Sequence, residues 1–139
     1  EDDGFRQHRI HSLKNAYFTG QKKVDELPAY ITAYDVCINP QMVNDITDGN
    51  YPLKIDEYLA MGKPTVATST HTMRHIFADH THLATNPEEW LSAIDRAVTE
   101  ADDKELAKQR IAFAETHSWG HSVKKIYGII DNFLKEKAT

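Results

Sequence analysis

The sequence has few cysteines, no long apolar run and no excess of basic residues, which argues against disulfide-rich, membrane-spanning and nucleic-acid-binding proteins. Its single cysteine, Cys37, allows no internal disulfide, and such sparse use fits a reducing compartment such as the cytoplasm. No apolar run approaches the roughly 20 residues of a membrane-spanning helix, and no signal-peptide pattern opens the chain. The formal net charge is −5 without a basic stripe, which argues against nucleic acid as a partner because that binding depends on phosphate neutralisation. We therefore expect a soluble cytoplasmic module without a transmembrane segment.

What is present predicts one α/β domain. A chain of 139 residues can bury about two-thirds of its unfolded surface. Short β-prone runs near residues 16–19, 35–39 and 64–67 alternate with helical periods, which predicts a parallel sheet with helices on both faces. A polar loop, residues 39–49, follows the second run, where ligands bind in open α/β sheets.

Further elements are expected on either side of this unit. A loose helical period begins at Phe5 and ends near Asn15, and a helix is predicted for residues 25–34. A possible edge strand at 83–85 precedes three helices, the first capped by Asn86 and the others spanning 103–116 and 122–135. The faces expected to be buried on these three helices are Trp90, Leu91, Ile94, Ala97 and Val98, then Leu106, Ile111 and Phe113, then Val123, Ile126, Tyr127, Ile130 and Phe133.

Residues 48–68, DGNYPLKIDEYLAMGKPTVAT, carry most of the functional information. Pro52 suits the first position of a helix that Gly62 ends. Lys54 lies in the first turn, where the helix dipole disfavours a cation, and Glu57 follows one turn later. A bound phosphate would resolve this conflict, and the Glu57 carboxylate could accept hydroxyl hydrogen bonds from a ribose. The alternative is a surface ion pair between Lys54 and Glu57.

Histidines cluster after this stretch. His71 and His75 have the i, i+4 spacing that can hold zinc on a helix, yet no acid lies between them as in metalloproteases. We therefore expect no metal site, and interpret these histidines as surface or ligand-contacting residues, with His71 at the carboxyl end of a strand.

Residues 50–68 resemble the nucleotide-sugar-binding motif in the C-terminal half of GT-B-fold glycosyltransferases of the group 1 type. Flanking segments resemble the same family, and they are Phe18–Gly20, Leu27–Tyr30, Ala33–Val36, Asn39–Pro40, Trp90–Ile94 and His117–Trp119. The resemblance implies a Rossmann-like domain that holds the sugar donor.

The resemblance also implies roles for particular residues. In the family, the carboxylate matching Glu57 holds the donor ribose, the basic residue matching Lys54 faces the diphosphate, and the loop after Gly20 lies near the base. Many members carry an earlier glutamate near the donor sugar. That position is Gly49 here, and whether the adjacent Asp48 replaces it is left open. The donor-binding residues expected on this basis are Lys54, Glu57, Asn50, Pro52, Leu53, Gly49, Gly20 and Gln21, with no catalytic residue assigned.

The function implied is donor binding in an enzyme that moves a sugar from a UDP- or GDP-type donor to an acceptor hydroxyl, in polysaccharide or glycoconjugate synthesis. The resemblance implies no cofactor or metal. The alternative is a non-catalytic flavodoxin-like α/β module that binds a phosphate or a protein.

The chain begins at Glu1, beyond the counterpart of the family's N-terminal domain and the first strands of its C-terminal domain. We therefore expect residues 1–139 to be one partial domain, inactive alone, whose partner is that missing N-terminal domain. The intact enzyme is expected in the cytoplasm or peripherally at the inner face of the membrane. One sheet edge should then be uncovered, or covered by self-association.

Overall fold

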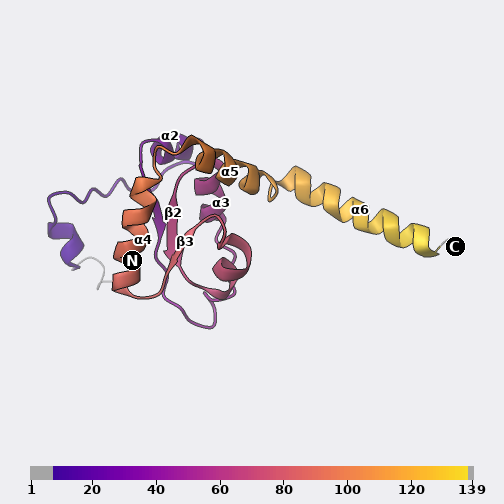
Figure 1. The fold of residues 1–139 in the computed structure, drawn as a ribbon, viewed down its shortest axis with the longest axis horizontal. Coiled ribbons are helices and arrows are strands. Elements are labelled where there is room, and N and C mark those ends of the chain that lie inside the picture. Colours follow the sequence, from indigo (N-terminus) through magenta and orange to yellow (C-terminus); the bar gives the residue numbers. More distant parts are fainter. Residues whose placement is uncertain (1–7, 138–139) are drawn as a thin grey trace.

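A parallel sheet of three strands forms the centre of the structure, a computed structural model in which residues 8–137 are described (Figure 1). The strand order is β1 (Cys37–Asn39), β2 (Thr65–Thr68), β3 (His82–Ala84). Ile38 lies opposite Val66. All four residues of the central strand β2 are buried, as expected of a short β-prone run covered on both faces. The α/β fold class predicted from the sequence is confirmed.

Helices cover both faces of the sheet. Helices α3 (Leu53–Ala60) and α5 (Lys104–Glu115) lie on one face, and α4 (Pro87–Thr99) lies on the other. Because neighbouring strand residues point to opposite faces, Ala67 and Val66 belong to different core clusters. The first cluster contains Ile55, Leu59, Ala67, Met73, Phe77 and Ala114, and the second contains Val66, Ala84, Ala93 and Ala97.

The connecting elements are short, and their ends follow local sequence signals. They are the 3₁₀ turn η1 (Arg9–Ser12), helix α2 (Leu27–Thr32) before β1, and the π-type turn η2 (Met73–Phe77) between β2 and β3. The Asn86 side chain accepts a hydrogen bond from Glu89 N–H at the start of α4, which confirms the predicted cap. Gly62 ends α3 with φ +71°, also as predicted.

The strand predicted for residues 16–19 is wrong. These residues form no strand, and Tyr17 and Phe18 are 84% and 53% exposed. A β-prone run becomes a strand only where a neighbour completes its hydrogen bonds, and none of β1–β3 pairs with this segment. The Phe18 ring instead stacks on His11, with ring centroids 4.3 Å apart.

The helical period predicted to begin at Phe5 lies partly outside the described residues. Of the described part of this predicted helix, from His8 to Asn15, only η1 is helical. The helix predicted for 25–34 is reduced to α2. Within the described chain, no strand pairs with the outer edge of β1, where Ile38 is 48% exposed. The outer edge of β3 is also unpaired in the described chain, so the expectation that missing strands leave one particular edge uncovered stays a prediction.

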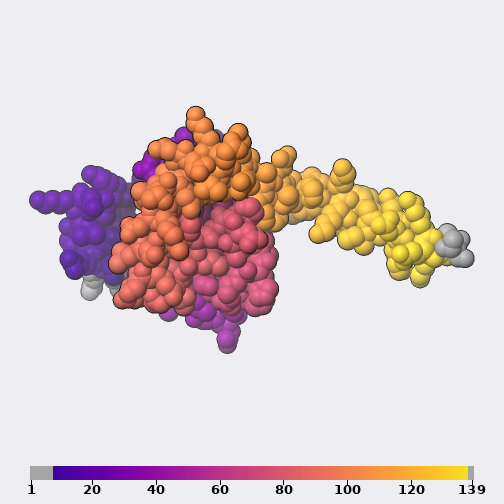
Figure 2. All heavy atoms as spheres, viewed as in Figure 1, coloured from indigo at the N-terminus to yellow at the C-terminus, as the bar shows by residue number. Residues whose placement is uncertain are grey.

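Helix α6 (Trp119–Lys137) extends from the domain as an arm (Figure 1), and Figure 2 shows it standing clear of the packed body. The burial predicted for its apolar face is wrong, since Val123, Ile126, Tyr127, Ile130 and Phe133 are all exposed. The apolar period is sufficient to make the helix amphipathic, but burial needs a second surface, and residues 8–137 offer none against it.

The burial predicted for α4 and α5 is also partly wrong. Leu91, Val98 and Ile111 are exposed, and the buried apolar residues of these two helices are alanines. These are Ala93 and Ala97 of α4 and Ala114 of α5. Across the described part of the chain, no helix combines the length and apolar character needed to span a bilayer.

Candidate functional site

The first turn of α3 is built differently from those of the other helices that pack on the sheet. Pro52 is its N-cap, so the helix begins one residue later than predicted, and no side chain in the described chain caps it. By contrast, Asn86 and Asp103 cap α4 and α5 through side-chain oxygens. Because proline has no side-chain acceptor, the first two backbone N–H groups of α3, those of Leu53 and Lys54, are available to an acceptor from outside the helix, while Ile55 N–H donates to Pro52 O at 2.9 Å.

Lys54 and Glu57 stand one turn apart on this helix. Neither makes a hydrogen bond or ion pair through its side chain with another residue of the range 8–137. The surface ion pair weighed as an alternative is therefore not formed. Both side chains instead line one cavity.

This cavity lies beside β1, between α2, α3 and the segment around Gly20, and has a volume of about 500 Å³. Three charged side chains line it, those of Lys22, Lys54 and Glu57. The other lining residues are mostly apolar or aromatic, namely Thr19, Gly20, Leu27, Tyr30, Ile31, Tyr34, Val36, Cys37, Ile38 and Tyr58. A concave, largely apolar site of this size with a few convergent charges is typical of small-molecule binding.

The charges and rings suit a ligand with separate anionic, hydroxyl and planar parts. Two ammonium groups can bind an anion, and the Glu57 carboxylate can accept hydrogen bonds from hydroxyls. The Lys22 ammonium already lies 4.8 Å from the centroid of the Tyr30 ring, which holds that cation against the aromatic wall.

The structure brings some of the predicted residues to this cavity and leaves others apart. Gly20 lines it with φ +67°, a backbone conformation that glycine adopts without strain. Gln21 is exposed next to Gly20 but does not line the cavity. The other four residues, Gly49, Asn50, Pro52 and Leu53, form the turn that leads into α3, where Pro52 is buried and the rest are exposed.

The loop before α3 is tied down by contacts that the sequence did not indicate. The Thr68 hydroxyl both accepts from Gln41 N–H, at 2.8 Å, and donates to Gln41 O, at 3.0 Å. The Asp48 carboxylate accepts from His71 N–H at 2.7 Å. Asp48 is thus engaged with the backbone that follows β2, and its carboxylate holds the loop.

A second set of residues missed from the sequence surrounds Asp56. The Tyr51 hydroxyl donates to Asp56 Oδ2 at 2.6 Å, and His117 Nδ1 lies 2.8 Å from Asp56 Oδ1. Burial, and then the hydrogen bond and charge of Asp56, raise the pKa of Tyr51 well above its ordinary value. His117 lies 61 residues from Asp56 along the chain, so no local pattern could reveal this contact.

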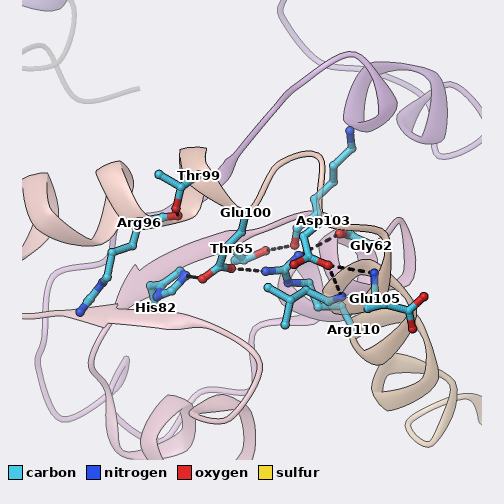
Figure 3. A network of polar contacts seen from close by, with 11 residues as sticks. Gly62, Thr65, His82, Arg96, Thr99, Glu100, Asp103, Glu105 and Arg110 are labelled. Carbon is cyan, nitrogen blue, oxygen red and sulfur yellow. Dashed lines mark hydrogen bonds and ion pairs between the residues drawn. The ribbon is translucent and has the colours of Figure 1, made fainter.

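The C-terminal end of α3 is held by a different polar network (Figure 3). Arg110, which is 5% exposed, pairs with Glu100 and donates to Gly62 O at 3.4 Å. His82 Nε2 lies 2.9 Å from the same Glu100 carboxylate. The network joins α3, β3, α5 and the end of α4, and it lies away from Lys54 and Glu57.

The predicted histidine cluster is compact but shows no metal-binding arrangement. The His71 and His75 rings stack with centroids 4.0 Å apart, and His75 Nδ1 lies 2.8 Å from His71 O. Within residues 8–137, no group of three or more His, Cys, Asp or Glu side chains could hold a metal ion. His71 does not line the cavity, so a contact with a ligand stays a prediction.

Comparison with known proteins relates this chain to enzymes that transfer sugars. The model of the family described as "Glycosyl transferases group 1" matches residues 2–100. The chain is 27% identical over 117 residues to a putative teichuronic acid biosynthesis glycosyltransferase, TuaH, of Bacillus subtilis strain 168. That similarity covers 82% of this chain and 30% of the relative, so the chain spans less than a third of that protein. No solved structure matches it significantly.

Proposed function

The chain belongs to the glycosyl transferases group 1 family, and from this premise we propose that it binds the nucleotide-sugar donor of a sugar-transfer reaction. The reaction moves a sugar from a nucleoside diphosphate carrier to an acceptor hydroxyl. The similarity to a protein named for teichuronic acid biosynthesis supports a polysaccharide-type product.

One observation carries the proposal. Lys54 and Glu57 line one cavity at the start of a helix without a side-chain cap, and they do not pair with each other in the described chain. A diphosphate accounts for this arrangement, because its negative charge is stabilised by the first N–H groups of α3 and by the Lys54 ammonium.

The nucleoside half of the donor fits the remainder of the cavity. Glu57, one turn beyond Lys54, accepts hydrogen bonds from ribose hydroxyls. The aromatic rings of Tyr30 and Tyr34 provide apolar surface for a planar base of a UDP- or GDP-type donor. The role of Gly20 is to let the chain turn close to this ligand.

Calorimetry with UDP, GDP and pyrophosphate tests the proposal on the 139-residue chain. Lys54→Ala removes a charge-assisted hydrogen bond of about 1.5–3 kcal/mol, so the affinity for all ligands bound should fall roughly ten- to over a hundredfold. Glu57→Gln should weaken the nucleoside diphosphate and leave pyrophosphate nearly unchanged, because pyrophosphate has no ribose.

Helix α5 supplies a matched control. Lys108 and Glu105 form an exposed i, i+3 ion pair, with 2.7 Å between Nζ and Oε1. Lys108→Ala and Glu105→Gln should leave all affinities unchanged. If Lys54→Ala and Glu57→Gln behave like these controls, the donor site is wrong, and the flavodoxin-like module becomes the better interpretation.

A further inference from the structure

We propose that Tyr51, Asp56 and His117 are positioning residues. They orient the first turn of α3, the diphosphate-binding turn whose N–H groups are proposed to hold the diphosphate, and they do not touch the donor. This inference rests on the proposed function, because it assigns these residues to the support of the same site. The contacts that carry it are the two hydrogen bonds to Asp56, with their lengths of 2.6 and 2.8 Å.

The Asp56 side chain points away from Lys54 around α3. Asp56 lies two positions after Lys54, which places the two side chains about 200° apart around the helix. The surroundings agree with this geometry, since Lys54 lines the cavity beside β1 and Asp56 lines a neighbouring hollow with His117, while Glu57 borders both. The Asp56 carboxylate therefore holds Tyr51 and His117 on a side of α3 that Lys54 does not occupy.

Both oxygens of this carboxylate are occupied. An ionised carboxylate only accepts hydrogen bonds, so the contact to Asp56 Oδ1 requires the proton of His117 to be on Nδ1. Tyr51 occupies the other oxygen. Because Tyr51 immediately precedes the N-cap Pro52, its hydrogen bond to Asp56 spans the start of α3. The bond thereby restrains the first N–H groups of the helix, which are the groups proposed to hold the diphosphate.

Aromatic packing connects this restraint to the core. The fully buried Phe77 packs against both the Tyr51 ring, with centroids 5.4 Å apart, and the His117 ring, with centroids 5.8 Å apart, and these two rings also contact each other. The Phe113 ring of α5 packs against the His117 ring, with centroids 4.6 Å apart. The position of the turn is therefore determined jointly by the core and by the junction between α5 and α6, where His117 lies.

The network at the other end of α3 provides a matched comparison (Figure 3). The side chains of His82 and Glu100 are 20% and 24% exposed, and those of His117 and Asp56 are 24% and 20% exposed. Each pair joins a histidine to a carboxylate at similar burial, with Arg110 as a further partner of Glu100, but only the pair of His117 and Asp56 borders the first turn of α3. If such a pair acts merely through the stability of the fold, its loss should change pyrophosphate affinity equally at either end of α3.

The test measures pyrophosphate affinity by calorimetry and melting temperature on the same variants of the full chain. Tyr51→Phe and His117→Ala should each lower the affinity about two- to tenfold, the loss that corresponds to one hydrogen bond. His117→Asn, whose side-chain N–H can replace Nδ1, should restore most of the affinity. His82→Ala should lower the melting temperature without changing the affinity.

The outcomes separate this inference from the proposed function. If Lys54→Ala weakens pyrophosphate binding but Tyr51→Phe and His117→Ala do not, the positioning role is wrong and the donor site stands. If His82→Ala weakens binding as much as His117→Ala, the effect is general destabilisation and the positioning role is again wrong. If Lys54→Ala has no effect, both proposals fail. Tyr51→Phe retains the packed ring, so it remains informative even where His117→Ala fails to fold.

Discussion

The backbone N–H of His71 donates a hydrogen bond to Asp48 Oδ1 over 2.7 Å. A second bond, from Thr72 N–H to Asp48 O at 3.3 Å, joins the same two segments. Asp48 thus acts toward the helical segment after β2 much as a capping residue does, because its side chain satisfies a backbone donor at the start of that segment. The loop that carries Gly49 and Asn50 is therefore held in place by the contact between Asp48 and His71, which lie 23 positions apart along the chain.

Loss of this contact should lower the stability of the domain. We expect Asp48→Ala to reduce the free energy of unfolding by about 0.5–2 kcal/mol, the range for a lost capping side chain. Urea denaturation at neutral pH measures this change. Asp45→Ala is the matched control in the same loop, because the exposed Asp45 side chain makes no hydrogen bond or ion pair within residues 8–137, and it should change little. Equal effects of the two substitutions would contradict the role given to Asp48.

Two glycines should respond oppositely to substitution by alanine. Gly62 has φ +71°, and an added Cβ would lie 3.1 Å from Ala107 Cβ, so Gly62→Ala should destabilise by about 1–2 kcal/mol. Gly49 has no heavy atom within 4 Å of an added Cβ and no positive φ, so Gly49→Ala should be neutral or slightly stabilising. Thermal unfolding of both variants provides the comparison, and a neutral Gly62→Ala would refute the left-handed end of α3.

Two isoleucines distinguish the core from the projecting helix. Ile55 of α3 is fully buried, so Ile55→Ala should cost about 2–5 kcal/mol of stability. Ile126 of α6 is 56% exposed, so Ile126→Ala should change stability by less than about 0.5 kcal/mol. Chemical denaturation of both variants tests the arrangement, and a large loss with Ile126→Ala would mean that α6 packs against the domain after all.

The single thiol should make stability depend on pH in the alkaline range. Burial raises the pKa of Cys37 from 9.0 to about 11, and the nearby Lys63 charge acts in the opposite direction with a smaller effect. Between these two pH values the unfolded chain loses the thiol proton while the folded chain keeps it, so the free energy of unfolding falls as pH rises. Below pH 9 the thiol contributes no slope, because it is protonated in both states.

Removing the thiol should remove this part of the pH dependence. Denaturation of wild type and Cys37→Ala at several pH values from 7 to 11 isolates the contribution, because other titrating groups are common to both proteins. The two curves of stability against pH should run parallel below pH 9 and converge above it. Parallel curves throughout would show that Cys37 ionises normally in the fold.

The sequence was a sufficient guide where the physics is local. Asn86 and Asp103 cap their helices because a side-chain oxygen reaches an N–H group two or three residues ahead. Gly62 ends α3 because it can adopt a left-handed conformation. Lys54 and Glu57 line the same cavity because residues three apart on a helix share a face. Each of these features depends on a few neighbouring residues, which the sequence displays directly.

The features that the sequence could not determine depend on partners far along the chain. Residues 16–19 have the composition of a strand, but they form none because no other strand pairs with them. Helix α6 has an apolar face that no other described element covers. The sequence marks Asp48 only as a possible replacement for the glutamate missing at Gly49, and it gives Asp56 no role, whereas the fold brings His71 to one and His117 to the other. By itself the sequence determined the Asn86 cap, the glycine that ends α3, the central strand and the charged face of α3. Only the tertiary structure decided which strands pair, which apolar faces are buried and which carboxylates are already engaged, because those outcomes require two distant segments to meet.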